Sequence, residues 1–196
     1  MALDAATSVQ PSWLRFADPP PVSSETEAIF AATREAVGYV RNQQRVLAHK
    51  PRALAAVTAL GNAVVRDGEG VLTPRERELI ALVVSVENRC EACVFAHAAA
   101  LRGHSGDPEW VATIEVNYRR AELTRRERSL ADYALKVTRA SAEVEPADLQ
   151  ALRDAGVPEL GVLEAATVVA YFNFTNRLNS GLGIRANAEA LEANRR

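Results

Sequence analysis

Residues 73–97 read TPRERELIALVVSVENRCEACVFAH, and this stretch predicts two helices joined by a short break. Thr73 is a typical helix cap, a proline follows at the first helical position, and Glu76 completes a capping box. The first helix is apolar on nearly all sides, so we expect it to be buried. A polar pair at residues 88–89 ends this helix, and a second helix begins near Cys90.

Outside this stretch, the chain shows further helical periodicity and no convincing run of alternating strand residues. Proline, glycine and capping residues mark the segment boundaries, and Gly103 is expected to end the helix that contains the cysteines. The sequence therefore predicts an all-α fold, a compact helical bundle. The expected helices cover about residues 23–40, 43–49, 52–66, 73–87, 90–101, 107–118, 124–138, 145–155 and 159–178.

Three parts follow one another along the chain. Residues 1–22 are rich in proline, serine and alanine and predict an extended N-terminal arm. Residues 23–186 form a single helical domain on this interpretation, and residues 187–196 are expected to be a frayed tail.

An internal similarity favours two related helical halves within the domain. LTPREREL at residues 72–79 matches LTRRERSL at residues 123–130 in six of eight positions, at an offset of 51 residues. On this hypothesis a unit at about 51–103 carries both cysteines, and a degenerate repeat spans about 107–180. Two unrelated capping boxes would give the same similarity, so both interpretations stay open.

The composition is that of an ordinary globular protein. Of 196 residues, 48% are apolar and 24% charged, and the net charge of −2 comes without a basic stripe, which argues against nucleic-acid binding. The N-terminus lacks the features of a signal peptide, and the longest strongly apolar run, residues 79–86, is far shorter than the ~20 residues of a membrane span. We therefore expect a cytoplasmic protein with no nucleic-acid or membrane partner.

The chain has two cysteines, separated by two residues, and in a reducing compartment this favours a redox, catalytic or metal-binding pair. Cys90 and Cys93 are expected in the first turn of a helix, where unpaired N–H groups and the neighbouring Arg89 favour thiolate. His97 follows Cys93 by four residues and projects from the same helix face. If the chain reverses at the break, Glu78 of the preceding helix faces His97 and orients it.

Glu78, eleven residues, Cys-x-x-Cys, three residues and His97 form a pattern that resembles the alkylhydroperoxidase D-like (AhpD-like) branch of the carboxymuconolactone decarboxylase superfamily. Two further segments, RVLAH at residues 45–49 and YFNFTNR at residues 171–177, resemble the peroxidase-related subgroup of that branch. The resemblance covers roughly residues 10–185.

The resemblance implies an AhpD-like all-helical fold, homo-oligomers (dimers, trimers or hexamers) and thiol-dependent reduction of hydroperoxides, and we expect no cofactor. It implies that Cys93 attacks the peroxide and becomes a sulfenic acid, while Cys90, the more exposed thiol, resolves it to a disulfide. Glu78 and His97 would relay the proton, and an external dithiol, a small molecule or a protein, would reduce the disulfide. The best-known members carry histidine directly before the second cysteine, where this chain has Ala92, so one proton-relay element is missing.

Three other interpretations stay open. The two thiolates, the imidazole and the carboxylate are ligands that suit tetrahedral zinc. Lactone decarboxylases share the fold but do not depend on a Cys-x-x-Cys pair, and two inert buried cysteines would suit a non-enzymatic oligomeric protein. The last long helix carries three further polar residues, Asn173, Asn176 and Arg177. They either contact the substrate or the residues around the thiols or, as we favour, satisfy polar groups at a helix end or a subunit interface.

Overall fold

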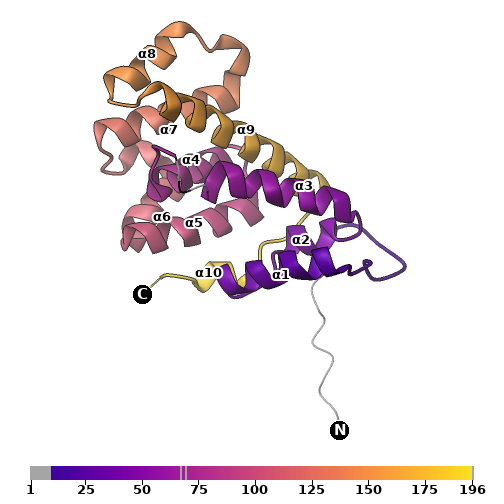
Figure 1. Cartoon of the computed structure of the whole chain (residues 1–196). Helices are drawn as coiled ribbons and strands as arrows, with labels where there is room; N and C mark the ends of the chain where they lie inside the picture. Colours follow the sequence, from indigo (N-terminus) through magenta and orange to yellow (C-terminus); the bar gives the residue numbers. More distant parts are fainter. Residues whose placement is uncertain (1–9, 67, 69, 196) are drawn as a thin grey trace.

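The computed structural model of the chain describes residues 10–66, 68 and 70–195, and every regular element within them is a helix (Figure 1). The predicted all-α class is therefore confirmed. The elements in chain order are α1 (Ser24–Val37), α2 (Asn42–Leu47), α3 (Pro51–Gly61), the π-helical η1 (Asn62–Arg66), α4 (Pro74–Glu87), α5 (Glu91–Ser105), α6 (Pro108–Asn117), the 3-10 turn η2 (Tyr118–Arg120), α7 (Arg125–Ala140), the 3-10 turn η3 (Ser141–Glu143), α8 (Pro146–Asp154), α9 (Glu159–Leu182) and α10 (Ala188–Glu192).

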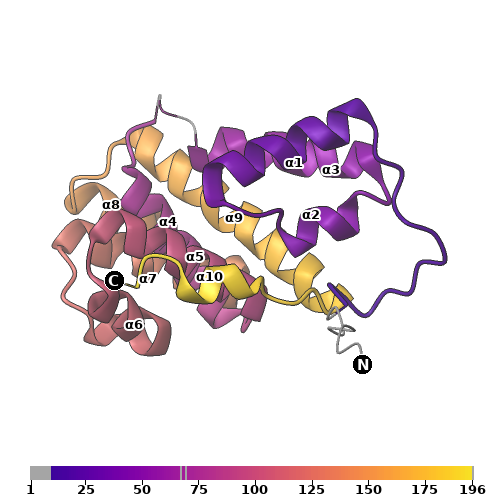
Figure 2. The same ribbon diagram turned by 90° about the horizontal axis from the view of Figure 1, so that it is seen from below.

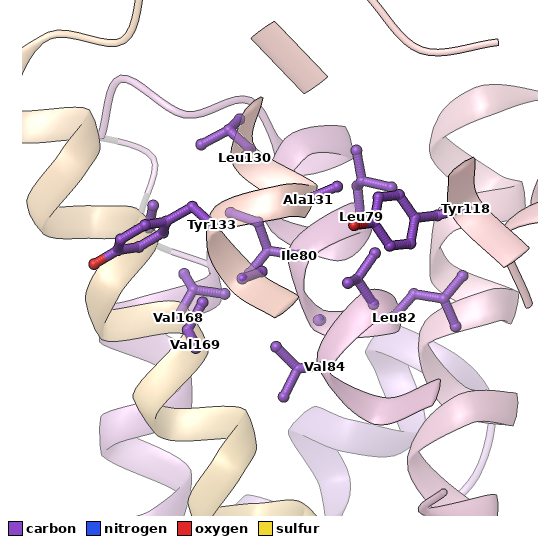
Figure 3. Close-up of a cluster of buried hydrophobic side chains, with 14 of the residues drawn as sticks. Leu79, Ile80, Leu82, Val84, Tyr118, Leu130, Ala131, Tyr133, Val168 and Val169 are labelled. Carbon is purple, nitrogen blue, oxygen red and sulfur yellow. The ribbon is translucent and has the colours of Figure 1, made fainter. Parts of the chain in front are cut away.

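Helix α4 forms the centre of the core. It packs against α5, α7 and α9, and its residues 79–85 are all buried, as the apolar run predicts. Each fully buried leucine or isoleucine contributes about 1.5–3 kcal/mol of hydrophobic stabilisation. Figure 3 shows the α4 side chains meeting residues of α7 and α9; the labelled core residues are Leu79, Ile80, Leu82, Val84, Tyr118, Leu130, Ala131, Tyr133, Val168 and Val169.

The N-terminal helices form a second group beside this core. Figures 1 and 2 show α1, α2 and α3 together on one side of the molecule, with α4 to α8 on the other. Helix α9 runs from the α7–α8 end toward α2 and α3, and it packs on α4, α5, α7, α8 and η1. The long α9 is thus the element that both groups share.

Described residues 10–23 contain no helix, and residues 11–13 contact the end of α9, while residues 1–9 of the expected arm lie outside the described residues. The backbone N–H of Trp13 donates to the carbonyl of Leu182 at 3.0 Å. Gly183 ends α9 in the left-handed conformation, with φ 60°, and a Cβ at this position would collide with the Trp13 ring. Glycine is therefore required at residue 183 for two reasons, its backbone conformation and the closeness of the tryptophan.

The C-terminal segment differs from the prediction of a frayed tail. Residues 188–192 form α10, which packs on α5 and buries Ala190. Arg102 of α5, itself buried, donates to the carbonyls of Ala190 at 3.2 Å and Ala193 at 3.0 Å. A buried guanidinium needs acceptors, and the tail supplies them. Helix α5 also differs from the prediction: it continues through Gly103, where its end was expected, and ends at Ser105.

Both predicted capping boxes form, at the beginnings of α4 and α7. They are joined reciprocally across the core: Arg75 donates to Glu127 at 2.9 Å, and Arg126 donates to Glu76 at 2.5 Å. These four residues correspond under the offset of 51, so the two similar segments meet through matching positions.

No helix in the described ranges is, by itself, both long and apolar enough to span a membrane. Helices α8 and α9 pass this test of length and composition only as a pair, bent by 119°.

Candidate active site

The turn between α4 and α5 positions the first cysteine. It is a Schellman motif, in which the N–H of Cys90 donates to the carbonyl of Ser85 at 3.0 Å and the N–H of Arg89 donates to that of Val86 at 3.0 Å. Arg89 occupies the left-handed position of the motif, with φ 51°, where glycine is usual. The chain therefore reverses within a few residues, and Cys90 becomes the N-cap of α5.

The two cysteines lie together at the beginning of α5. Their Cα atoms are 5.3 Å apart and their sulfur atoms are at disulfide distance. Cys93 lies in the first turn, where N–H groups without intrahelical partners favour a thiolate. The exposed fractions are 2% for Cys90 and 5% for Cys93, so the expectation that Cys90 is the more exposed thiol is wrong. The Schellman turn holds Cys90 inward, because the residue at its position typically packs on the preceding helix.

A cavity of about 700 Å³ opens beside the second cysteine. Its wall is formed by α1, α2, α3 and η1 on one side and by α4, α5 and α9 on the other, with contributions from α10. Cys93 belongs to this wall, whereas Cys90 does not. Ala92, at the position where the resemblance expects a histidine, also faces the cavity. Cavities of this size accommodate organic ligands rather than only water or hydrogen peroxide.

The hairpin of α4 and α5 brings Glu78 and His97 into contact. His97 Nδ1 lies 2.8 Å from Glu78 Oε2, and both residues line the cavity. A carboxylate at Nδ1 keeps the proton on that nitrogen and leaves Nε2 as the free one. The ring of Phe172 meets His97 edge-on at a centroid distance of 4.3 Å, which restricts rotation of the imidazole. The acid and the imidazole thus lie on the same cavity wall as Cys93.

The structure adds a residue that sequence reasoning missed. Asn179 of α9 donates from Nδ2 to the sulfur of Cys93 at 3.2 Å, and its Oδ1 accepts from Gln43 of α2 at 2.9 Å. The second bond fixes which end of the amide faces the sulfur. Asn179 follows Asn176 by three residues on an otherwise apolar helix, and this was the only signal the sequence offered.

Cations and phenols also surround the cavity. Arg41 and Arg66 both line it; burial lowers the pKa of Arg41, and repulsion by Arg66 lowers it further, although a guanidinium remains charged. Burial raises the pKa of Tyr39 and of Tyr171, which line the same space, so both phenols are neutral at physiological pH.

The candidate residues Asn173, Asn176 and Arg177 do not line the cavity. Asn173 and Asn176 accept from Asn88 Nδ2 at 3.0 and 3.1 Å, and Asn176 donates to Ser85 Oγ at 3.2 Å. Arg177 donates to the carbonyl of Asn173 at 2.9 Å. The two asparagines therefore connect α9 to the turn before the cysteines, and the contact with the sulfur is made by Asn179 instead.

The donor groups do not converge as a metal site. Among the described residues, no three His, Cys, Asp or Glu side chains are placed to hold a metal ion. Tetrahedral zinc needs three or four protein ligands, so the zinc interpretation has no support in this part of the chain.

Comparison with known proteins agrees with the geometry. A sequence model of the carboxymuconolactone decarboxylase family matches residues 51–118, which contain the Cys-x-x-Cys turn. An uncharacterized protein of Haemophilus influenzae strain Rd is 50% identical over 48 residues, which cover 24% of this chain and 41% of that protein. The chain therefore matches less than half the length of that relative.

Two crystal structures resemble the chain over almost its whole length. An uncharacterized peroxidase-related protein from Silicibacter sp. TM1040 is 39% identical with a TM-score of 0.89, and the match covers 95% of this chain and 97% of that one. An uncharacterized peroxidase-related protein from Ralstonia eutropha JMP134, with an alkylhydroperoxidase AhpD core, is 33% identical with a TM-score of 0.86, covering 91% and 96% respectively. The chain therefore belongs to the carboxymuconolactone decarboxylase family, in its AhpD-like, peroxidase-related subgroup.

Proposed function

We propose that this protein is a thiol-dependent peroxidase that reduces hydroperoxides through a dithiol–disulfide cycle of Cys90 and Cys93. One observation carries the proposal: Cys93 lies in the cavity wall with the Glu78–His97 pair, and Cys90 lies behind it at disulfide distance. A nucleophile, a base and a group that orients the base are thus gathered at one opening. Membership of the AhpD-like subgroup supports the same chemistry.

The reaction has two steps on the protein. The Cys93 thiolate attacks the terminal oxygen of the hydroperoxide; the O–O bond breaks, a proton from His97 reaches the leaving oxygen, and the products are an alcohol and a sulfenic acid. Cys90 loses its proton and attacks the Cys93 sulfur as a thiolate, the S–O bond breaks, and the departing hydroxide takes up that proton, so water leaves as the disulfide forms. The peroxide gains the two electrons that the thiols lose. An external dithiol restores the thiols by exchange.

Two contacts prepare Cys93 for this role. The N–H of the Asn179 amide stabilises negative charge on the sulfur, and the start of α5 acts in the same direction. Glu78 holds the imidazole of His97 in place, with Nε2 left to carry a proton. The assignment of Cys90 as the resolving thiol follows from its position outside the cavity, where a peroxide does not reach it first.

Mass spectrometry of the reduced protein, before and after addition of cumene hydroperoxide, tests the proposal. We expect the wild type to lose two hydrogens, Cys93→Ser to remain unchanged, and Cys90→Ser to gain one oxygen as a trapped sulfenic acid. Equal residual turnover in both variants would contradict the assigned roles. Thiols that stay inert in the folded wild type would favour a non-enzymatic oligomeric protein instead.

The proposal includes a reducing, cytoplasmic setting and a homo-oligomer, a dimer, trimer or hexamer. Exposed apolar side chains along α9 support association, because a surface of this kind is normally covered; they are Leu160, Leu163 and Phe174. Light scattering of the purified chain measures the mass of the assembly.

A further inference from the structure

The cavity wall contains a guanidinium that forms no direct ion pair with a carboxylate of the described residues. Arg41 lies between α1 and α2, is partly buried, and lines the cavity. Within the described part of the chain, no carboxylate forms an ion pair with Arg41 or with Arg66, whose guanidinium donates to Asn62 at 2.7 Å. Buried cations are normally paired, so an unpaired arginine in a cavity wall indicates a missing anion.

The charged residues of the cavity wall also favour an anionic ligand. Arginines outnumber carboxylates there: the cations are Arg41, Arg66 and Arg185, and the acids are Glu25 and Glu78. Arg66, Arg185 and Glu25 are all exposed, whereas Arg41 is partly buried. Glu78 is bonded to His97, although its charge also acts on Arg41 and raises the pKa of that guanidinium. The wall therefore carries one excess positive charge, and Arg41 is the cation that water screens least.

The rest of the wall is apolar and spacious. Small aliphatic residues of α1 and α3 form much of it, among them Ala28, Ile29, Ala32, Leu54 and Val57. At about 700 Å³ the cavity is far larger than hydrogen peroxide requires, since a water molecule occupies only about 30 Å³ of liquid. The wall therefore suits a ligand with both an apolar body and a charged end.

We propose that the cavity selects organic hydroperoxides that carry a carboxylate, with Arg41 and Arg66 binding the carboxylate and Cys93 receiving the peroxide group. This inference rests on the proposed peroxidase function. A guanidinium has paired N–H donors that match the two oxygens of a carboxylate. The neutral phenols of Tyr39 and Tyr171 are further donors in the same wall.

Binding of unreactive ligands tests the anion site without any peroxide chemistry. Calorimetry with the oxidised full-length protein compares octanoate with octanol, which has the same chain length and no charge. We expect octanoate to bind more tightly than octanol, and Arg41→Gln to weaken octanoate binding about ten- to a hundredfold. Arg41→Lys should restore part of the affinity. Arg66→Gln, at an exposed residue, tests the same site if the Arg41 variants fold poorly.

The control for loss of positive charge alone is Arg120→Gln, at an exposed arginine in η2 that does not line the cavity. We expect it to bind octanoate as the wild type does. Equal affinity for octanoate and octanol, or an equal effect of Arg41→Gln and Arg120→Gln, would overturn the inference.

Single-turnover oxidation of the reduced protein then separates the two proposals. Linoleic acid hydroperoxide and its methyl ester differ in charge but carry the same peroxide, and we expect the acid to react faster by a ratio that falls toward one in Arg41→Gln. Equal rates for acid and ester in the wild type would overturn the substrate class and leave the peroxidase function standing. Octanoate binding without thiol oxidation by either hydroperoxide would refute the peroxidase function instead.

Discussion

Arg89 is a residue whose backbone, rather than its side chain, serves the site. It adopts φ 51° at the C-terminal end of α4 and is exposed, and the turn it completes places Cys90 over the start of α5. A side chain in the left-handed conformation costs about 1–2 kcal/mol. The sequence stretch Asn-Arg-Cys thus carries strain in the turn that forms the site.

We therefore expect Arg89→Gly to raise the free energy of unfolding by about 0.5–1 kcal/mol, since glycine relieves the conflict and its greater chain entropy offsets only part of the gain. Arg89→Val should lower it by about 1–2 kcal/mol, because a β-branched side chain is poorly tolerated there. Urea unfolding of the reduced proteins measures both. Identical midpoints for the three proteins would show that the turn is not strained.

Glu78 is the residue that decides how His97 acts. Replacing it by glutamine keeps the shape but removes the carboxylate that orients His97 through Nδ1, so we expect Glu78→Gln to slow peroxide-driven thiol oxidation about 10²-fold or more while the helical circular dichroism is unchanged. Stopped-flow tryptophan fluorescence or thiol titration gives the rate. Glu87→Gln, on the same helix but bonded to Arg139, is the matched control. A fully active Glu78→Gln would remove the proton relay from the mechanism.

At the scale of elements, two reciprocal arginine–glutamate pairs join the start of α4 to the start of α7, where the two similar segments lie. Glu76 accepts from the Thr73 N–H at 2.8 Å and also from Arg126. Likewise, Glu127 accepts from the Thr124 N–H at 2.9 Å and also from Arg75. Each carboxylate therefore serves its own helix cap and the other helix at once.

Glu76→Ala should lower the free energy of unfolding by about 2–3 kcal/mol, because it removes a cap and leaves Arg126 without its partner. A double-mutant cycle with Arg126→Ala should show a coupling energy of about 1–2 kcal/mol. Urea unfolding of the four proteins supplies the values. Strictly additive effects would mean that the two helices do not stabilise each other through this contact.

At the scale of the whole molecule, burial affects every tyrosine in the same direction. Burial is the largest cause of the raised pKa at Tyr39, Tyr118, Tyr133 and Tyr171, and at Tyr118 a hydrogen bond to Asp132 raises it further. The folded protein therefore keeps the phenol protons, which the unfolded chain releases near the ordinary tyrosine pKa of 10.0. The stability contributed by these groups is present below about pH 10 and is lost as the pH rises above it.

We expect the free energy of unfolding to fall steeply above about pH 10, and tyrosinate absorbance of the native protein to appear only as it unfolds. Titration in urea should show ionisation near the ordinary value. Tyr118→Phe removes one of the four ionising phenols, so the free energy of unfolding should fall less steeply with pH in this variant. Ionisation of all four tyrosines in the folded state at the ordinary value would contradict this account.

Local features of the sequence were sufficient for the helices and their caps. Thr73 and Thr124 cap as predicted because a capping box is formed by residues three apart, and α4 is buried because its own residues are apolar on every side. The predicted reversal between α4 and α5 also explains why Glu78 meets His97, because a short break between two helices brings facing positions together.

What the sequence alone determined, then, is the helices from α1 to α9 and the hairpin of α4 and α5, because these depend on interactions between neighbours in the chain. Only the tertiary structure decided that Asn179 reaches the sulfur, that Arg41 lines the cavity and that the C-terminal segment packs as α10. Asn179 lies 86 residues from Cys93, and Ala190 lies 88 residues from Arg102. Contacts at such separations depend on how α9 and the N-terminal helices pack, and local periodicity carries no information about that.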